Sequence, residues 1–202
     1  MVPEHYFSEN PSAEYSEKTI SVRLGKHDVT VVTSSGMFSP DHVDTGTKVL
    51  LEHIEAAPDH GNLLDIGCGW GPISLALAMA RPNTTVWALD VNRRALEITA
   101  KNAARLGLKN IRCVLESDVP ADLKFTGIWS NPPIRVGKSV LHGLLKSWLP
   151  RLEKSAEAYL VVQKNLGADS LLKWMQDEFP LLASERVNSE KSFRVLRSTM
   201  KG

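Results

Sequence analysis

Two patterns of apolar and polar positions follow one another along this chain of 202 residues. In residues 20–33 apolar and polar side chains alternate on either side of Gly25, and this period of two predicts a β-hairpin with the glycine in its turn. A turn-rich stretch follows, and residues 47–57 then carry apolar side chains at helical spacing. The first part of the chain is therefore expected to form a hairpin, an irregular stretch and one helix.

From residue 62 onward, short apolar runs alternate with longer amphipathic stretches. The apolar runs predict strands, at 62–67, 84–90, 111–117, 125–130 and 157–164. The amphipathic stretches predict helices, at 71–80, 93–107, 138–152 and 168–179. Two final runs predict an antiparallel pair, at 181–189 and 192–200. This order favours the α/β class, with a doubly wound, mostly parallel, seven-stranded sheet, helices on both faces and an N-terminal β-hairpin.

Composition adds limits on size and location. Apolar residues make up 43% of the chain, and we expect a single domain over 1–202, with an arm and hairpin at 1–35 and the α/β core at 36–202. No apolar run reaches the roughly 18–20 residues of a membrane span. The first residues also lack the basic and apolar regions of a secretory signal, so we expect a cytoplasmic protein and no membrane partner.

Charge and cysteine content argue against two kinds of site. The formal net charge is +1, so any binding of nucleic acid must depend on a local basic face. The two cysteines, Cys68 and Cys113, are too few for a disulfide framework, and no cysteine–histidine cluster has the spacing of a zinc site. We therefore expect two reduced thiols and no metal.

A glycine-rich segment, DIGCGWG at 65–71, lies between a predicted strand and a predicted helix. Gly67 and Gly69 allow a tight turn that brings the backbone against a ligand, and Gly71 opens a helix whose N–H groups can face a negative charge. Dinucleotide sites use G-x-G-x-x-G, whereas here Pro72 stands where the third glycine belongs. The observed G-x-G-x-G, with an acid two residues ahead, resembles motif I of class I S-adenosyl-L-methionine (SAM)-dependent methyltransferases. The alternative is a tight turn that binds nothing.

A carboxylate, Asp90, ends the next predicted strand. A carboxylate in this position can accept two hydrogen bonds from ribose hydroxyls, in dinucleotide and SAM sites alike. It therefore indicates a nucleoside ligand without choosing between the two cofactors. Val91 and Asn92, which follow it, are expected near the ribose and adenine.

The segment Asn131-Pro132-Pro133-Ile134 directly follows the fourth predicted strand of the core. An exocyclic amine is a poor nucleophile because its lone pair is delocalised, so a catalyst must hold both N–H bonds and aim the lone pair. The Asn131 side-chain oxygen and the Pro132 carbonyl can form such a pair of acceptors, and the prolines fix the backbone. Most of the rate would then come from orientation, without a strong base.

The motif N-P-P followed by an aromatic or aliphatic residue resembles that of amino-group methyltransferases, which act on DNA adenine, RNA guanine N2 or protein glutamine. More narrowly, the chain resembles the methyltransferase small-domain family, in particular its RsmC-like ribosomal RNA guanine-N2 methyltransferases. The segments that carry this resemblance run in the same order along nearly the whole chain, from HYFSENP at 5–11 through GMFS and DTGT at 36–47, LLDIGCGWGPISLALA, SNPPIRVGKSV at 130–140 and VVQKNLGA at 161–168 to FRVLRS.

The resemblance implies a class I, Rossmann-like SAM methyltransferase acting on guanine N2 of 16S-type ribosomal RNA, with ribosomal RNA or the small ribosomal subunit as partner. It places Asp118 at the adenine amino group and implies a SAM site made of Phe38, Asp44, Thr45, Gly46, Asp65, Gly67, Cys68, Gly69, Gly71, Asp90, Val91, Asn92, Asp118, Val119 and Asn131. One departure concerns the substrate: Ile134 stands where many relatives have Phe or Tyr, which can stack on a base.

Other readings and a possible RNA contact stay open at this point. The alternatives are methylation of a protein glutamine or of another RNA or DNA amine, a SAM-binding module without activity, and a dehydrogenase. An RNA target must be single-stranded or flipped out of its stack. A basic rim near the active-site mouth could hold it, formed by Arg135, Lys138, Lys146, Arg151, Lys154 and Lys164, although these residues could equally form a solvated helix face.

Overall fold

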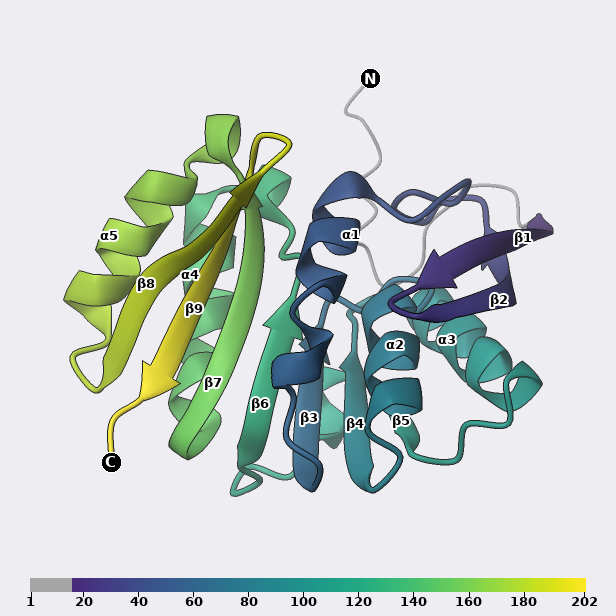
Figure 1. Cartoon of the computed structure of the whole chain (residues 1–202), viewed down its shortest axis with the longest axis horizontal. Helices are drawn as coiled ribbons and strands as arrows, with labels where there is room; N and C mark the ends of the chain where they lie inside the picture. The colour runs from purple at the N-terminus through teal and green to yellow at the C-terminus, as the bar shows by residue number, and fades with distance from the viewer. Residues whose placement is uncertain (1–15) are drawn as a thin grey trace.

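The computed structural model describes residues 16–202, and the aromatic arm segment at 5–7 lies outside them. Its main sheet has seven strands, in the order β5-β4-β3-β6-β7-β9-β8 (Figure 1). The strands are β3 (Gly61–Ile66), β4 (Thr84–Leu89), β5 (Ile111–Val114), β6 (Phe125–Ser130), β7 (Leu152–Gln163), β8 (Leu182–Glu190) and β9 (Phe193–Met200). β3 to β7 are parallel, and β9 is antiparallel to both of its neighbours. The expected doubly wound, mostly parallel sheet is confirmed.

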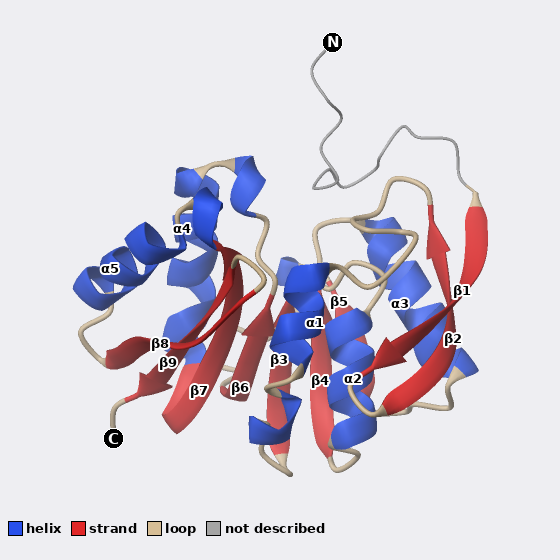
Figure 2. Ribbon diagram, turned by 45° about the horizontal axis from the view of Figure 1, so that its top comes forward, coloured by secondary structure: helices blue, strands red, loops and turns tan. Residues whose placement is uncertain are grey.

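Helices cover both faces of this sheet (Figure 2). One face carries α1 (Thr45–Leu51), α2 (Pro72–Ala80) and α3 (Arg93–Arg105), which bury apolar side chains against it. The other carries α4 (Lys138–Trp148) and α5 (Ala168–Glu178). Two apolar cores result, one on each face of the sheet. The close packing of the sheet between them fixes the positions of the loops that follow its strands.

The predicted hairpin forms a separate two-stranded sheet, β1 (Glu17–Leu24) and β2 (His27–Ser34). It packs against α2 and α3, on the side of the molecule where β5 lies, and pairs with no strand of the main sheet (Figures 1 and 2). Asn102 of α3 is fully buried and holds it there. The Asn102 Oδ1 accepts from the Val32 N–H at 2.7 Å, and its Nδ2 donates to the Val32 carbonyl at 2.8 Å.

Two predicted helices are shorter than expected. α1 begins at Thr45 and ends at Leu51, with a 3₁₀ turn at Ile54–Ala56, so the predicted 47–57 helix is not continuous. α4 ends at Trp148, followed by a 3₁₀ turn at Leu149–Arg151. Pro150 explains the second difference, because its ring and missing N–H do not fit a helix interior.

Two predicted strands also have different bounds. β7 begins at Leu152 instead of 157, and β5 ends at Val114, before a 3₁₀ turn at Glu116–Asp118. The Asp118 carboxylate accepts a hydrogen bond from the Leu115 N–H at 3.2 Å. This local contact competes with the sheet for the backbone and accounts for the early end of β5.

Candidate active site

The glycine loop connects the end of β3 to the start of α2. Gly67 and Gly69 have φ values of +77° and +57°, and a Cβ on either would meet no atom within 4 Å. The N–H groups of Gly67 and Cys68 donate to the Leu89 carbonyl at 2.8 and 2.9 Å, which holds the loop against the end of β4. The left-handed backbone and the open space beside it allow a ligand to approach the main chain directly.

Gly71 is required for a different reason. A Cβ there would lie 2.9 Å from Thr99 Cγ2 of α3, and the backbone φ is +94°. The Thr99 hydroxyl also donates to the Gly69 carbonyl at 2.9 Å. α3 therefore packs directly against the glycine loop and fixes its shape.

Asp90 follows β4 and is bound by two main-chain N–H groups. Its Oδ2 accepts from Gly69 at 2.9 Å, and its Oδ1 accepts from Asn92 at 2.9 Å. Burial raises the pKa of the Asp90 carboxyl, while these hydrogen bonds act in the opposite direction. Each oxygen keeps a further lone pair, so the carboxylate can still accept hydrogen bonds from a pair of hydroxyls.

A hollow lies between the glycine loop, the loop before α1 and the end of β6. Its enclosed part has a volume of about 60 Å³ and it opens at Gly67, which is exposed. Eight of the predicted SAM-site residues line it, namely Phe38, Asp44, Gly67, Cys68, Gly69, Asp90, Asn92 and Asn131. Phe38 is 48% exposed, so its ring is available to cover a ligand. The sheet thus brings together, at one edge, residues from five separate segments.

The amide hydrogens of Asn131 point at the start of α1. The Asn131 Nδ2 donates to Asp44 Oδ2 at 3.0 Å and to Thr47 Oγ1 at 3.1 Å. Asp44 is the N-cap of α1 and also accepts from the N–H groups of Gly46 and Thr47, at 2.8 and 3.2 Å. The reverse amide orientation would set the Asn131 oxygen against a carboxylate. Both donors are therefore engaged, and the side-chain oxygen is left as an acceptor.

The start of α1 also contacts the last strand of the sheet. A Cβ on Gly46 would lie 2.7 Å from Cε1 of Phe193, the first residue of β9. The aromatic ring therefore packs directly against the helix turn that holds Asn131.

Pro132 and Pro133 form a tight turn after Asn131. Pro133 has φ −74° and ψ 76°, close to the centre of an inverse γ-turn, and the Ile134 N–H donates to the Pro132 carbonyl at 2.8 Å. The turn fixes the direction of that carbonyl and leaves it one free lone pair. Ile134 lines a second hollow, of about 180 Å³, together with Lys138, Leu166, Trp174 and others.

Seven residues predicted for the SAM site do not line the hollow: Thr45, Gly46, Asp65, Gly71, Val91, Asp118 and Val119. Val91 is half-exposed, and Thr45 and Asp118 are exposed. Val119 is buried and packs in the core on the α4 side of the sheet.

Asp65 is fully buried at the end of β3 and supports the glycine loop through contacts with α2. Its Oδ2 accepts from the N–H and hydroxyl of Ser74, at 2.9 and 2.5 Å, which ties β3 to the first turn of α2. Its Oδ1 has no hydrogen-bond partner among the described residues. Burial raises the pKa of Asp65 to about 7, against the opposing effect of the Ser74 hydrogen bonds.

Three residues that support the site were not predicted individually. Thr47 binds Asn131, and the signal for it was its place in the DTGT segment. Thr99 and Asn102 support the glycine loop from α3, the second by donating to the Trp70 carbonyl at 3.0 Å. Nothing in the sequence pattern of the predicted 93–107 helix singled these two polar residues out.

The predicted basic rim is divided by the fold. Lys138 and Lys164 follow strands at the carboxyl edge, but Lys154 lies near the start of β7, roughly 30 Å from its end. Arg151 is bound to the Leu123 carbonyl at 3.0 Å and stacks over Trp148, and Lys146 pairs with Glu178 at 2.8 Å. The Arg135 side chain lies outside the described part of the structure. The six residues therefore do not form one rim.

Within residues 16–202, no group of three or more histidine, cysteine, aspartate or glutamate side chains could hold a metal ion. No helix in this part of the chain is long and apolar enough to cross a membrane.

The residues of the hollow fit a nucleoside cofactor with a charged tail. Gly67 and Gly69 leave space that a Cβ would fill, and Asp90 offers carboxylate lone pairs beside them. The hollow continues to the Asn131 amide, so a group bound at the glycines lies next to the acceptor pair.

Comparison with known proteins agrees with this geometry. The family model described as methyltransferase small domain matches residues 28–197. The Bacillus subtilis protein YbxB, of uncharacterized function, is 36% identical over 96% of this chain and 98% of its own length. Ribosomal RNA small subunit methyltransferase C of Acinetobacter baumannii is 31% identical over 77% of this chain but 48% of its own length. The chain therefore spans about half of the latter relative.

Among solved structures, the T. Thermophilus 16S rRNA N2 methyltransferase RsmC, in complex with AdoMet and guanosine, superposes with a TM-score of 0.78. That comparison covers 96% of this chain and 52% of RsmC at 21% identity, which shows a common fold. A methyltransferase from Pyrococcus furiosus gives a TM-score of 0.60 over 77% of this chain. This chain belongs to the methyltransferase small domain family and has the fold of the SAM-dependent methyltransferases.

Proposed function

We propose that this protein transfers a methyl group from SAM to an exocyclic amino nitrogen, and that its substrate is guanine N2 in ribosomal RNA of the 16S type. The observation that carries the proposal is the Asn131 amide, whose two N–H groups are engaged by Asp44 and Thr47 so that its oxygen is left to accept. The RsmC relatives support the choice of ribosomal RNA and of guanine.

The glycine loop and Asp90 hold the cofactor in this proposal. Asp90 accepts hydrogen bonds from the ribose and Phe38 covers the methionine end. Val91 and Asp118 do not line the hollow but are exposed, and in this proposal they meet the adenine. Asp65 acts through Ser74 and α2, since its carboxylate is fully buried. When bound, SAM supplies an electrophilic methyl group.

The substrate amine is oriented by two acceptors. The Asn131 side-chain oxygen accepts a hydrogen bond from one N–H of the amine, and the Pro132 carbonyl accepts one from the other. These two hydrogen bonds orient the amine so that its nitrogen lone pair faces the methyl group. SAM bound at the glycine loop would supply the methyl group to this nitrogen and would leave as S-adenosylhomocysteine, and the methylated amine would lose its extra proton to water. No strong base is needed, because an arylamine becomes acidic once it is alkylated. Ile134 offers an aliphatic face to the base, and the hollow beside it is lined largely by apolar side chains.

The test is nucleoside mass spectrometry of unmodified ribosomal RNA after incubation with the purified protein and SAM. We expect N2-methylguanosine to form, and Asn131→Ala to lower the rate on the order of 10²-fold or more without changing SAM affinity. A different methylated nucleoside would contradict the guanine substrate. Full activity of Asn131→Ala would contradict the role of the amide.

A further inference from the structure

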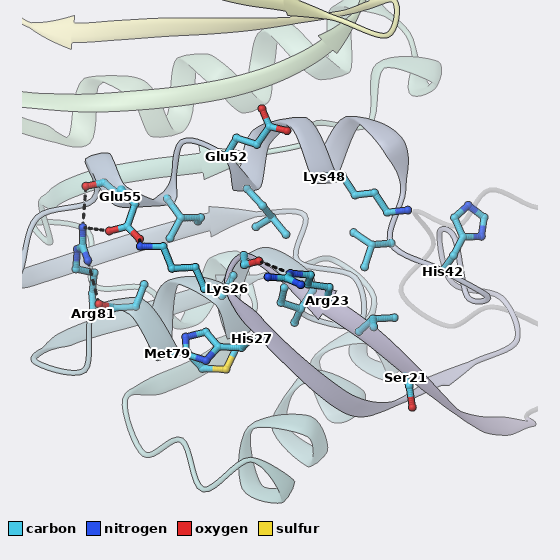
Figure 3. A pocket seen from close by; sticks show the side chains of 18 of the residues that line it. Ser21, Arg23, Lys26, His27, His42, Lys48, Glu52, Glu55, Met79 and Arg81 are labelled. Carbon is cyan, nitrogen blue, oxygen red and sulfur yellow. Dashed lines mark hydrogen bonds and ion pairs between the residues drawn. The ribbon is translucent and has the colours of Figure 1, made fainter.

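A groove separate from the candidate active site runs between the hairpin, α1 and the end of α2 (Figure 3). Its volume is about 890 Å³, the largest of the hollows described for residues 16–202. Buried or partly buried apolar side chains contribute to its lining, among them Leu51, Ile54 and Met79. The hairpin supplies one wall and α1 the other, and the hydrogen bonds of Asn102 help to hold the hairpin in place.

The carboxylates along the groove are already neutralised or directed away from it. Glu55 pairs with Lys26 at 2.7 Å and with Arg81 at 3.5 Å, and Asp41 pairs with Lys18. Glu52 points out of the groove in Figure 3. A hydrogen bond with Glu52 is one of the contacts that lower the pKa of Glu190 in β8, after the larger effect of Lys191. The acidic residues of the lining therefore leave its other cations uncompensated.

Two of these cations, Arg23 and Lys48, form no ion pair with any residue in the described part of the chain. The Arg23 side chain makes one hydrogen bond within the described residues, in which its Nε donates to the Gly25 carbonyl at 3.3 Å. Its cross-strand neighbour Asp28 lies on the same face of the hairpin but forms no ion pair with it. Figure 3 shows Arg23 near the middle of the groove, with Lys48 and His42 toward one end and Lys26 and Arg81 toward the other.

The groove is continuous with the active-site loop. Its lining includes residues 41–43, and residues 37–39 of the same loop line the hollow beside the glycines. Lys48 directly follows Thr47, which binds Asn131. A chain that leaves the active site across this loop would reach Lys48 first and Arg23 next.

We propose that this groove binds the single-stranded RNA that flanks the target nucleotide, with Arg23 and Lys48 on consecutive phosphates and bases against the apolar floor. The phosphates of RNA can pair with cations that have no carboxylate partner, and its flat bases can pack on the aliphatic side chains below them. The inference rests on the proposed function in that the bound polymer is the RNA that is methylated. A second copy of this chain is the competing occupant, and the experiment separates the two.

The experiment measures binding of a fluorescein-labelled single-stranded RNA by anisotropy over a range of salt concentrations, with the intact protein. Arg23→Gln with Lys48→Gln is compared with a matched control, Lys109→Gln with Lys173→Gln, which neutralises two exposed lysines outside the groove. Loss of two phosphate contacts should lower the slope of log affinity against log salt by about 1.4, and the affinity on the order of 10-fold at low salt. The control should change neither quantity by a comparable amount.

Equal RNA binding by the groove variant and the wild type would overturn the inference, as would an equal loss in the control. Loss of a concentration-dependent dimer in the groove variant, with RNA affinity intact, would assign the groove to a second copy instead. SAM affinity of the groove variant should match the wild type. If the wild type methylates RNA and the groove variant binds it normally, only this inference fails. If RNA binds through the groove but gains no methyl group, the proposed function fails and only the assignment of the groove to single-stranded RNA stands.

Discussion

At the scale of single residues, the Asn131 amide is held by side chains 84 and 87 positions earlier in the sequence. Asp44 and Thr47 come from one turn of α1, and the turn is itself capped by Asp44. The cap of α1 and the orientation of the Asn131 amide therefore depend on the same carboxylate oxygen. A substitution of Asp44 would therefore change both the stability of α1 and the orientation of Asn131. A substitution of Thr47 removes a contact with Asn131 and leaves the cap of α1 in place.

Thr47→Val should lower the methyl-transfer rate roughly three- to tenfold, because it keeps the side-chain shape but removes one hydrogen bond that orients Asn131. Single-turnover kinetics with saturating SAM would measure this. SAM affinity should stay within about twofold, and Thr47→Ser, which keeps the hydroxyl, should recover most of the rate. If Thr47→Ser is as slow as Thr47→Val, the hydroxyl does not act as described.

Asp65 predicts a pH dependence of stability. Its pKa is about 7 in the folded protein because of burial, against about 3.9 in an unfolded chain, so the folded state keeps a proton that the unfolded state releases between these values. Stability from this group is fully present below pH 4 and is lost as the pH rises through 7. Between pH 5 and pH 8 the loss should be about 2 kcal/mol.

Urea unfolding of the wild type and of Asp65→Asn at pH 5 and pH 8 would check this. The variant cannot ionise, so the fall in unfolding free energy from pH 5 to pH 8 should be smaller in it. Asp90, whose pKa is also raised, is present in both proteins and cancels in the comparison. Identical pH dependence in the two proteins would show that Asp65 does not titrate in this range.

At the scale of elements, α3 connects three parts of the molecule. Thr99 supports the glycine loop, and Asn102 joins β2 to the loop through the Val32 main chain and the Trp70 carbonyl. The hairpin has no strand partner in the main sheet. Its position, and with it one wall of the groove, therefore depends on this buried amide together with the apolar side chains of the hairpin that pack in the core.

Asn102→Ala should destabilise the protein by about 3 kcal/mol, because it leaves the buried Val32 N–H without its partner and removes two further hydrogen bonds. Hydrogen exchange should show the largest loss of protection in β2 and smaller changes in β6 and β7. Asn110→Ala is the control, since its side chain makes longer contacts of 3.2 and 3.3 Å. An equal effect of both substitutions would argue against a special role for Asn102.

At the scale of the whole molecule, cofactor binding should be visible as a gain in stability. S-adenosylhomocysteine at 100 times its Kd should stabilise the folded state by about 2.7 kcal/mol, which raises the Tm by roughly 5–10 °C. Asp90→Ala should abolish this shift, because it removes the carboxylate beside Gly69. Asn131→Ala should keep it, and a loss of the shift there would place Asn131 in cofactor binding instead.

The sequence predicted the layers of this fold better than its long-range contacts. Alternation of apolar runs identified every strand of the main sheet, and the glycine spacing identified the loop that lines the hollow. Periodicity does not report which distant side chains meet. Strand order and strand length decide that Thr47 contacts Asn131 and that Lys154 lies far from the carboxyl edge of the sheet. Both become definite only in the folded chain.

The contact between Phe193 and Gly46 has a consequence for the order of synthesis. Translation proceeds from the N-terminus, so a nascent chain that ends after β7 already contains every residue lining the hollow. The ring that packs on the first turn of α1 is added only when β9 is made. The first turn of α1, which holds the Asn131 amide, therefore gains this packing contact only after every described residue that lines the hollow has been made.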